Sequence, residues 1–254
     1  MSLAAIRNLK SALRIVLLAA LAANSAPQGH QENTDPFPMK EGTTWVYRGI
    51  VRWYDMQSQK TVTTKITSHS EVIRVIRRNG LEASVVKGFP ADFNWSEGNA
   101  RPHDWVFIRT EDDKLFWFTD DGEVKDRLKR LDNSEDSLQG MLTDDDLLMR
   151  LPPKKGMKCC DEESRARTDD HYCWVVTSQR EITLSGVKGV EPGKRTAFLL
   201  QYVTNPDDTE FEFVPGVGFI NYSYHHHGTV ADTEMSLIEY HASGSAKASP
   251  GAKQ

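Results

Sequence analysis

The chain has 254 residues and a formal net charge of −5, from 31 basic and 36 acidic side chains. Three basic residues and no acidic ones lie within residues 1–25, so the rest of the chain carries a charge of 28 − 36 = −8. Lys and Arg are scattered singly, whereas binding to nucleic acid requires a concentrated basic face. This composition excludes nucleic acid as a partner, and 6 Trp, 7 Tyr and 10 Phe are enough for a large core.

Residues 1–25 have the pattern of a secretory signal peptide. Arg7, Lys10 and Arg14 precede an apolar run at 15–23, and small residues follow it. A membrane-spanning helix needs about 20 apolar residues, and this run is shorter. We therefore predict cleavage near residue 25, a periplasmic or extracellular location, and no transmembrane span after cleavage. An uncleaved anchor and an organellar transit peptide are the alternatives.

The mature chain divides by composition into three parts. Residues 26–35 are polar and predict a linker, residues 36–241 predict a β-rich domain, and residues 242–254 are small and polar, which predicts a disordered tail. Within the domain, runs of aromatic and β-branched residues alternate with short turns. The predicted strands lie at 45–54, 61–77, 81–87, 105–109, 115–119, 173–179, 181–184, 196–203, 209–214, 219–226 and 229–240.

The turns between these strands favour an antiparallel meander. Asn79-Gly80 is a strong hairpin signal, because both central residues of a type I′ turn need a positive φ. Asp121-Gly122 is interpreted as a further turn. Most connections are short and no long amphipathic helix intervenes, so the fold class is mainly β. One short helix is predicted near 143–150, where Thr143 would cap three Asp residues at the positive end of the helix dipole.

A short motif occurs twice in the chain. The segment FPMKEGTTW at 37–45 shares the pattern apolar-Pro-x-Lys-x-Gly with LPPKKGMKC at 151–159. In both places Pro favours an extended entry, Gly permits a tight turn, and a strand follows. The motif therefore indicates two similar halves, at 36–130 and 151–241, that form a curved or partly open barrel or a sandwich.

The order of two motifs resembles a known group of proteins. FPMKEGTTWVY near the start and FVPGVGFINYSYHHHGTV near the end are similar to an exported bacterial group of unassigned function. Its members carry a P-L-K-x-G-x-x-W-x-Y opening and an A-P-G-V-G motif before the last strands. The resemblance implies export and a β-rich fold, and it carries no catalytic residues. The chain departs from the pattern at Cys159, where the repeated motif would have an aromatic residue.

Three cysteines, Cys159, Cys160 and Cys173, flank a polar segment. In an oxidising compartment we expect one disulfide, joining Cys173 with Cys159 or Cys160, because adjacent cysteines cannot easily bridge each other. One thiol would then remain. A zinc or copper site from these cysteines and His171 is the alternative, although no familiar Cys-x-x-Cys pair is present.

A second candidate metal site is the cluster His225-His226-His227. Alternate side chains of a strand share a face, so His225 and His227 would point to the same side and could hold zinc or copper. His171, His241 or Asp232 would have to supply a third ligand. The alternative is three solvent-exposed histidines at the end of a hairpin.

The sequence contains no recognisable catalytic motif. Gly-x-Ser-x-Gly and His-Glu-x-x-His are absent, and Val214-Pro215-Gly216-Val217-Gly218 lacks the Lys of a phosphate-binding loop. We therefore predict an exported, non-catalytic β protein without a cofactor. Its partner would be a small ligand, a lipid or an envelope protein, held on a sheet face or in a cavity between two halves. A metal-binding protein is the alternative, followed by a hydrolase with a dispersed triad.

Overall fold

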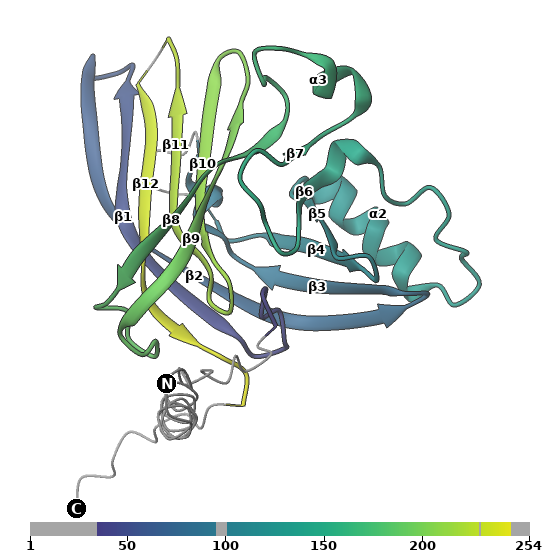
Figure 1. The fold of residues 1–254 in the computed structure, drawn as a ribbon. Coiled ribbons are helices and arrows are strands. Elements are labelled where there is room, and N and C mark those ends of the chain that lie inside the picture. The colour runs from purple at the N-terminus through teal and green to yellow at the C-terminus, as the bar shows by residue number, and fades with distance from the viewer. Residues whose placement is uncertain (1–34, 95–100, 229, 245–254) are drawn as a thin grey trace, which may run out of the picture. The chain divides into compact units, whose positions relative to one another are not determined.

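The computed structural model describes residues 35–94, 101–228 and 230–244. The predicted signal peptide, the linker up to residue 34 and the tail from residue 245 lie outside the described residues. In the described residues one twelve-stranded sheet dominates the structure (Figure 1). Its strands are β1 (Thr44–Asp55), β2 (Lys60–Arg78), β3 (Leu81–Lys87), β4 (Asp104–Thr110), β5 (Lys114–Phe118), β6 (Leu147–Arg150), β7 (Lys158–Cys159), β8 (Trp174–Leu184), β9 (Gly193–Val203), β10 (Asp207–Val214), β11 (Gly218–His226) and β12 (Ala231–His241).

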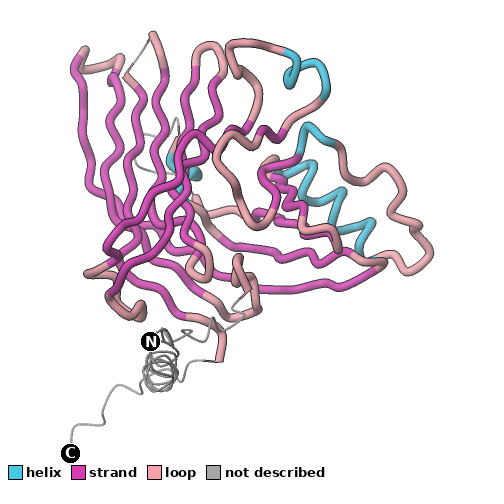
Figure 2. The backbone as a smooth tube through the Cα atoms, in the orientation of Figure 1, coloured by secondary structure: helices cyan, strands magenta, loops and turns pink. Residues whose placement is uncertain are grey.

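Every pairing between these strands is antiparallel, and their order is β6-β5-β4-β3-β2-β1-β12-β11-β10-β9-β8-β7. Two six-stranded meanders, β1–β6 and β7–β12, are thus joined where β1 pairs with β12. The sheet curls until its edge strands β6 and β7 approach each other, which gives a nearly closed barrel (Figures 1 and 2). The predicted mainly β class and antiparallel meander are confirmed.

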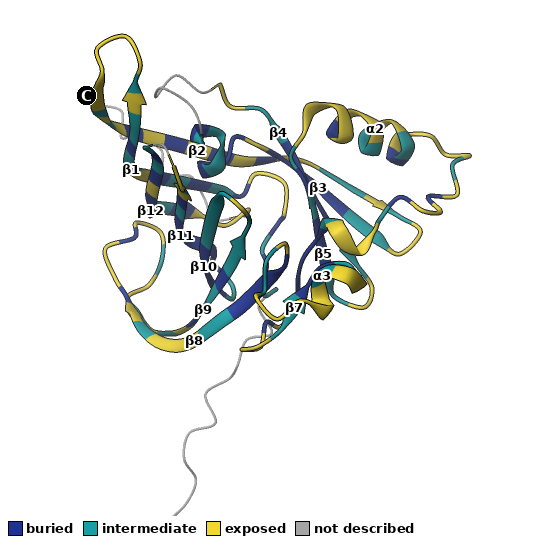
Figure 3. Ribbon diagram, turned by 90° about the horizontal axis from the view of Figure 1, so that it is seen from above, coloured by how far each residue is buried: buried dark blue, intermediate teal, exposed yellow. Residues whose placement is uncertain are grey.

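The β2–β3 hairpin shows how local sequence sets this topology. Asn79 and Gly80 have φ values of 49° and 75°, as the predicted type I′ turn requires. Along β2, inward side chains from Ile66 to Val72 are buried at every second position and their neighbours are exposed (Figure 3). This period of two gives the sheet one buried and one solvated face.

The inward face of the sheet is filled by aromatic rings. Phe37, Phe89, Phe107, Phe211 and Phe219 form a contacting cluster with ring centroids 4.6–6.0 Å apart. Such side chains supply the largest buried apolar areas of any residue type and dominate core energetics. The barrel interior is therefore a packed core over most of its length.

The helices differ from the prediction. The prediction of a short helix near 143–150 is wrong. Only a 3-10 turn, η2 (Asp144–Asp146), forms there, and the apolar residues after it form strand β6, which pairs with β5. The neighbouring sheet edge supplies hydrogen-bond partners, which favours a strand. A second 3-10 turn is η1 (Pro90–Phe93), and α3 (Glu162–Ala166) is a short helix.

The expected turn at Asp121-Gly122 is the start of a helix, α2 (Asp121–Asp132). The carboxylate of Asp120 accepts hydrogen bonds from two backbone N–H groups of the first turn, a standard N-cap. Val124 and Leu131 are buried, and α2 contacts β4 with this side while its outer side is exposed (Figure 3). No helix in the described residues is long and apolar enough to cross a membrane.

Candidate functional site

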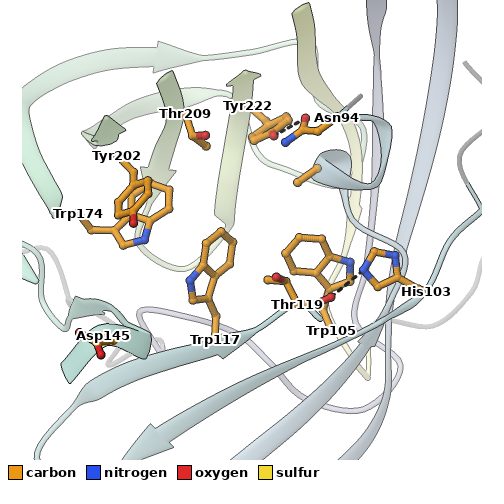
Figure 4. A pocket seen from close by; sticks show the side chains of 11 residues that line it. Asn94, His103, Trp105, Trp117, Thr119, Asp145, Trp174, Tyr202, Thr209 and Tyr222 are labelled. Carbon is orange, nitrogen blue, oxygen red and sulfur yellow. Dashed lines mark hydrogen bonds between the residues drawn. The ribbon is translucent and has the colours of Figure 1, made fainter. Parts of the chain in front are cut away.

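A partly open pocket of about 410 Å³ interrupts the packed interior (Figure 4). One wall comes from the first meander, with η1, β4, β5 and η2, and the other comes from β8, β9, β10 and β11 of the second. The lining residues are Ala91, Asn94, His103, Trp105, Trp117, Thr119, Asp145, Trp174, Tyr202, Thr209 and Tyr222. This volume lies within the range of small-molecule sites, about 300–1,000 Å³.

Aromatic rings form a continuous band around this pocket. The ring of Trp117 lies 5.6 Å from Trp105 and 5.3 Å from Trp174, measured between centroids, and it meets Trp174 edge to face. Trp174 in turn lies 5.1 Å from Tyr202, its cross-strand partner in β9. Because the interplanar angles range from 31° to 79°, the four rings face the space from different directions (Figure 4).

Behind Trp105 lies a buried carboxylate, Asp92 of η1, whose side chain is 2% exposed. It accepts hydrogen bonds from Trp105 Nε1 at 2.8 Å and from the backbone N–H of Phe89 at 3.0 Å. His103 Nδ1 lies 2.8 Å from the same carboxylate, and the imidazole stacks on Trp105. Burial raises the pKa of Asp92, and its hydrogen bonds and His103 oppose this shift.

The second nitrogen of His103 is also engaged. Nε2 lies 3.1 Å from the carbonyl oxygen of Thr119, which can only accept a hydrogen bond (Figure 4). A hydrogen bond to this oxygen needs a proton on Nε2, and Nδ1 faces the carboxylate of Asp92. With both ring nitrogens occupied, His103 has no free lone pair to act as a general base toward a molecule in the pocket.

The remaining polar groups are arranged around the pocket. Tyr222 donates its hydroxyl proton to Asn94 Oδ1 at 2.6 Å, and burial raises the pKa of this phenol (Figure 4). Asp145 is an exposed residue of η2, and slight desolvation and the neighbouring carboxylates of Asp161 and Asp146 raise its pKa. Burial also raises the pKa of Tyr202. The pocket thus combines aromatic walls with several polar groups, some of which already bond one another.

The predicted histidine pair lies elsewhere, at the end of β11. The rings of His225 and His227 meet edge to face with centroids 5.3 Å apart, and His225 Nδ1 contacts Asp232 of β12. His226 points away from them and pairs with Asp207 at 2.8 Å. The alternation follows from strand geometry.

Two further predicted ligands do not join this pair. His171 and His241 each pair with a carboxylate two residues before them in the chain. In residues 35–94, 101–228 and 230–244, no group of three or more His, Cys, Asp or Glu side chains is placed to hold a metal ion. Metal binding by His225 and His227 stays a prediction.

The structure joins Cys160 and Cys173 in a disulfide, and Cys159 is a buried free thiol. Cys159 points into the main core, whereas Cys160 and Cys173 form a small separate apolar cluster with Val175. Alternation along the chain therefore separates the two adjacent cysteines, so only Cys160 faces Cys173.

The pocket residues were not identified as a site from the sequence. Trp105, Trp117 and Trp174 were part of predicted strands, and the sequence signal was only that each strand carried a Trp. Their meeting depends on strand register across the closed barrel, which sequence spacing does not reveal.

Neither models of known protein families nor curated protein sequences match the chain. Two solved structures with a similar arrangement come from Bacteroides fragilis and Parabacteroides distasonis. The first is described as an exported protein with a YMCC-like fold, with 11% identity, a TM-score of 0.38, and coverage of 82% of this chain and 99% of the other. The second is described as a lipoprotein, with 14% identity, a TM-score of 0.36, and coverage of 83% and 100%.

Proposed function

We propose that the protein is exported to the periplasm or the cell exterior and that it binds a small ligand without chemically altering it. The leader pattern at 1–25 supports export. The observation that carries the binding role is the aromatic pocket between the two meanders. A concave pocket that combines aromatic walls with convergent polar groups is a usual form of a small-molecule site.

The packing behind the pocket favours a small ligand over a long acyl chain. Deeper in the barrel, the space bounded by Phe37, Phe89 and Phe219 is only about 10 Å³, too small for a hydrocarbon chain to enter. The rings that close it are in mutual contact. A ligand is therefore held at the mouth of the barrel and does not thread through its centre.

The chemistry of the lining favours binding over catalysis. His103 uses both nitrogens and Tyr222 uses its hydroxyl in bonds within the protein. The described residues that line the pocket include no Cys, Ser or Lys, and the hydroxyls of Thr119 and Thr209 lack a free imidazole to activate them because both nitrogens of His103 are engaged. These contacts keep the walls in place, which suits a preformed binding site.

Binding of the neutral fluorophore N-phenyl-1-naphthylamine to the mature, tag-free protein tests this proposal. We expect saturable binding that quenches Trp fluorescence and is lost in Thr209→Phe, which fills the pocket, and weakened in Trp117→Leu. Trp53→Leu is the matched control, because Trp53 lies outside the pocket and is also partly buried. Equal binding by Thr209→Phe and the parent, with both folded by circular dichroism, would contradict the proposal.

Metal binding at His225 and His227 is a second candidate function. The observation in its favour is that their rings adjoin and that Asp232 contacts His225. Zinc or copper titration of the parent and of a His225→Ala/His227→Ala variant tests it. Sub-millimolar binding that the double variant abolishes supports a metal role, and identical titrations remove it.

A further inference from the structure

We propose that the ligand of the aromatic pocket is an organic cation of the quaternary or tertiary ammonium class. This inference rests on the proposed binding function and specifies its ligand. Three features of the pocket support it: the sign of its charges, its aromatic walls, and the hydrogen bonds that several of its polar groups already make within the protein.

The ionisable groups of the pocket favour a positive ligand. Among the described lining residues there is no Lys or Arg, and only Asp145 and His103 can ionise near neutral pH. His103 is already paired with the carboxylate of Asp92. The side that His103 occupies therefore presents no unbalanced positive charge, and Asp145 is left as the charged group that a ligand would meet.

The surroundings of Asp145 strengthen this preference. Three further carboxylates, those of Asp144, Asp146 and Asp161, are close enough to disfavour its ionisation. In the part of the chain that the structure describes, no Lys or Arg pairs with Asp145; Arg165 is directed instead to Asp144 at 3.5 Å. A bound cation would supply the missing counter-charge, while an anion would meet repulsion.

The walls of the pocket suit a bulky, weakly hydrated cation. The face of an aromatic ring carries partial negative charge, and Trp attracts cations most strongly. Trp105 and Trp174 each contact the ring of Trp117 between them, and Tyr202 continues the row. Rings arranged at several angles around one space form the kind of aromatic cage that recognises quaternary ammonium groups.

Several polar groups of the pocket are not available to a neutral polyol, and the hydroxyls of Thr119, Thr209 and Tyr202 are the other polar groups of its lining. Recognition of several hydroxyl groups needs free donors and acceptors, since buried polar groups must be paired. In this pocket His103, Asn94 and Tyr222 are already bonded within the protein. A methylated ammonium group has no such requirement, because it is held by ring faces and by charge.

Choline and its uncharged carbon isostere 3,3-dimethyl-1-butanol provide a direct test, since they have nearly the same shape and differ in charge. Each is titrated into the mature protein and followed by calorimetry and by displacement of N-phenyl-1-naphthylamine. We expect choline to bind at least about tenfold more tightly than the alcohol, the order of a desolvated cation–π contact. Equal or tighter binding of the alcohol, or no choline binding while the fluorophore still binds, overturns the cation inference and leaves the binding function intact.

Two matched variants resolve the role of the carboxylate. Asp145→Asn should weaken choline binding about two- to fivefold, as expected for an exposed ion pair, and leave the alcohol unaffected. Asp126→Asn removes an exposed carboxylate of α2 that lies outside the pocket and should leave both affinities unchanged. An equal loss for choline and the alcohol in Asp145→Asn contradicts the charge argument. Failure of the fluorophore itself to bind the pocket overturns the proposed binding function instead.

Discussion

The two copies of the repeated motif form the same turn, the first before the central strand β1 and the second before the edge strand β7. In the first copy, Gly42 has a φ of 83° and its N–H donates to the carbonyl of Val72, whose own N–H donates to Thr43. In the second copy, Gly156 has a φ of 84° and exchanges the corresponding bonds with β8. Each copy also closes with a bond from the residue after Gly to the motif Lys.

The strands that follow the two turns differ. β1 has twelve residues and is paired on both sides, with β2 and β12. β7 has two residues and is an edge strand that pairs only with β8. At the matching position after the turn, the first copy has Trp45, whose Nε1 donates to Val217 O at 2.7 Å, and the second has Cys159.

The comparison shows that local sequence determines the turn, whereas contacts with distant parts of the chain determine the strand that follows it. The turn depends on a few residues and recurs wherever the motif recurs, whereas the length of a strand depends on the partners available to it. At the edge, the disulfide between Cys160 and Cys173 holds the chain where strand pairing ends. A duplicated origin of the two halves remains a proposal that this shared turn supports.

The largest expected effect on stability comes from replacing Trp45 or Cys159, the two matching residues of the motif copies, by Ala. Trp45 is 3% exposed and lies against Tyr240, so Trp45→Ala should lower the free energy of unfolding by about 3–5 kcal/mol. Cys159→Ala removes one buried sulfur and should lower it by about 1 kcal/mol. Urea denaturation measures both. A larger loss from Cys159→Ala than from Trp45→Ala would mean that the edge copy, and not the central one, anchors the core.

Removing the disulfide should weaken the second copy selectively. The bridge spans 13 residues, and a loop of this size contributes about 3 kcal/mol in the chain-entropy model. We expect Cys160→Ala/Cys173→Ala to lose about 2–4 kcal/mol, within the usual range for a native disulfide. Hydrogen exchange should quicken at the amides of Gly156 and Val176, while the amide of Gly42 stays protected. Uniform quickening in both copies would argue against a local role for the bridge.

The same contrast explains what could be predicted from the sequence. The hairpin at Asn79-Gly80 depends on two residues, and the alternation in β2 reports a solvated outer face, so both were predictable. α2 was missed because Gly122 resembled a turn residue, although Asp120 as N-cap and the spacing of Val124 and Leu131 were present.

The candidate site was the least predictable feature. Its lining residues run from Ala91 to Tyr222 and meet only because the sheet closes on itself. The histidine cluster at 225–227 was conspicuous in the sequence because its members are adjacent, and it lies outside the pocket. Adjacent residues are easily recognised as a motif, whereas a site built from six or more strands and turns depends on register.

A smaller effect is expected from the two motif glycines. Valine at a positive φ is strained, at a cost of about 1–2 kcal/mol, so Gly42→Val and Gly156→Val should each destabilise by this amount. Space is not the limit, because an added Cβ would find no atom closer than 3.9 Å at Gly42 and none within 4 Å at Gly156. Gly193→Val, at a glycine without a positive φ, should change stability by less than about 0.5 kcal/mol. Unchanged melting of either motif variant would disprove the shared turn.

The smallest expected effect is on the reactivity of the Cys159 thiol, which occupies the position in the second copy that Trp45 occupies in the first. Burial raises the pKa of Cys159 to about 11, and the side chain is 2% exposed. At pH 8 only ~0.1% of such a thiol is ionised, compared with roughly a quarter of a free cysteine of pKa near 8.5. Iodoacetamide should therefore leave the native protein unlabelled at pH 8 and label one thiol per chain in denaturant, as read by mass spectrometry. Rapid native labelling at Cys159 would show that the second copy, unlike the first, does not direct this position into the core.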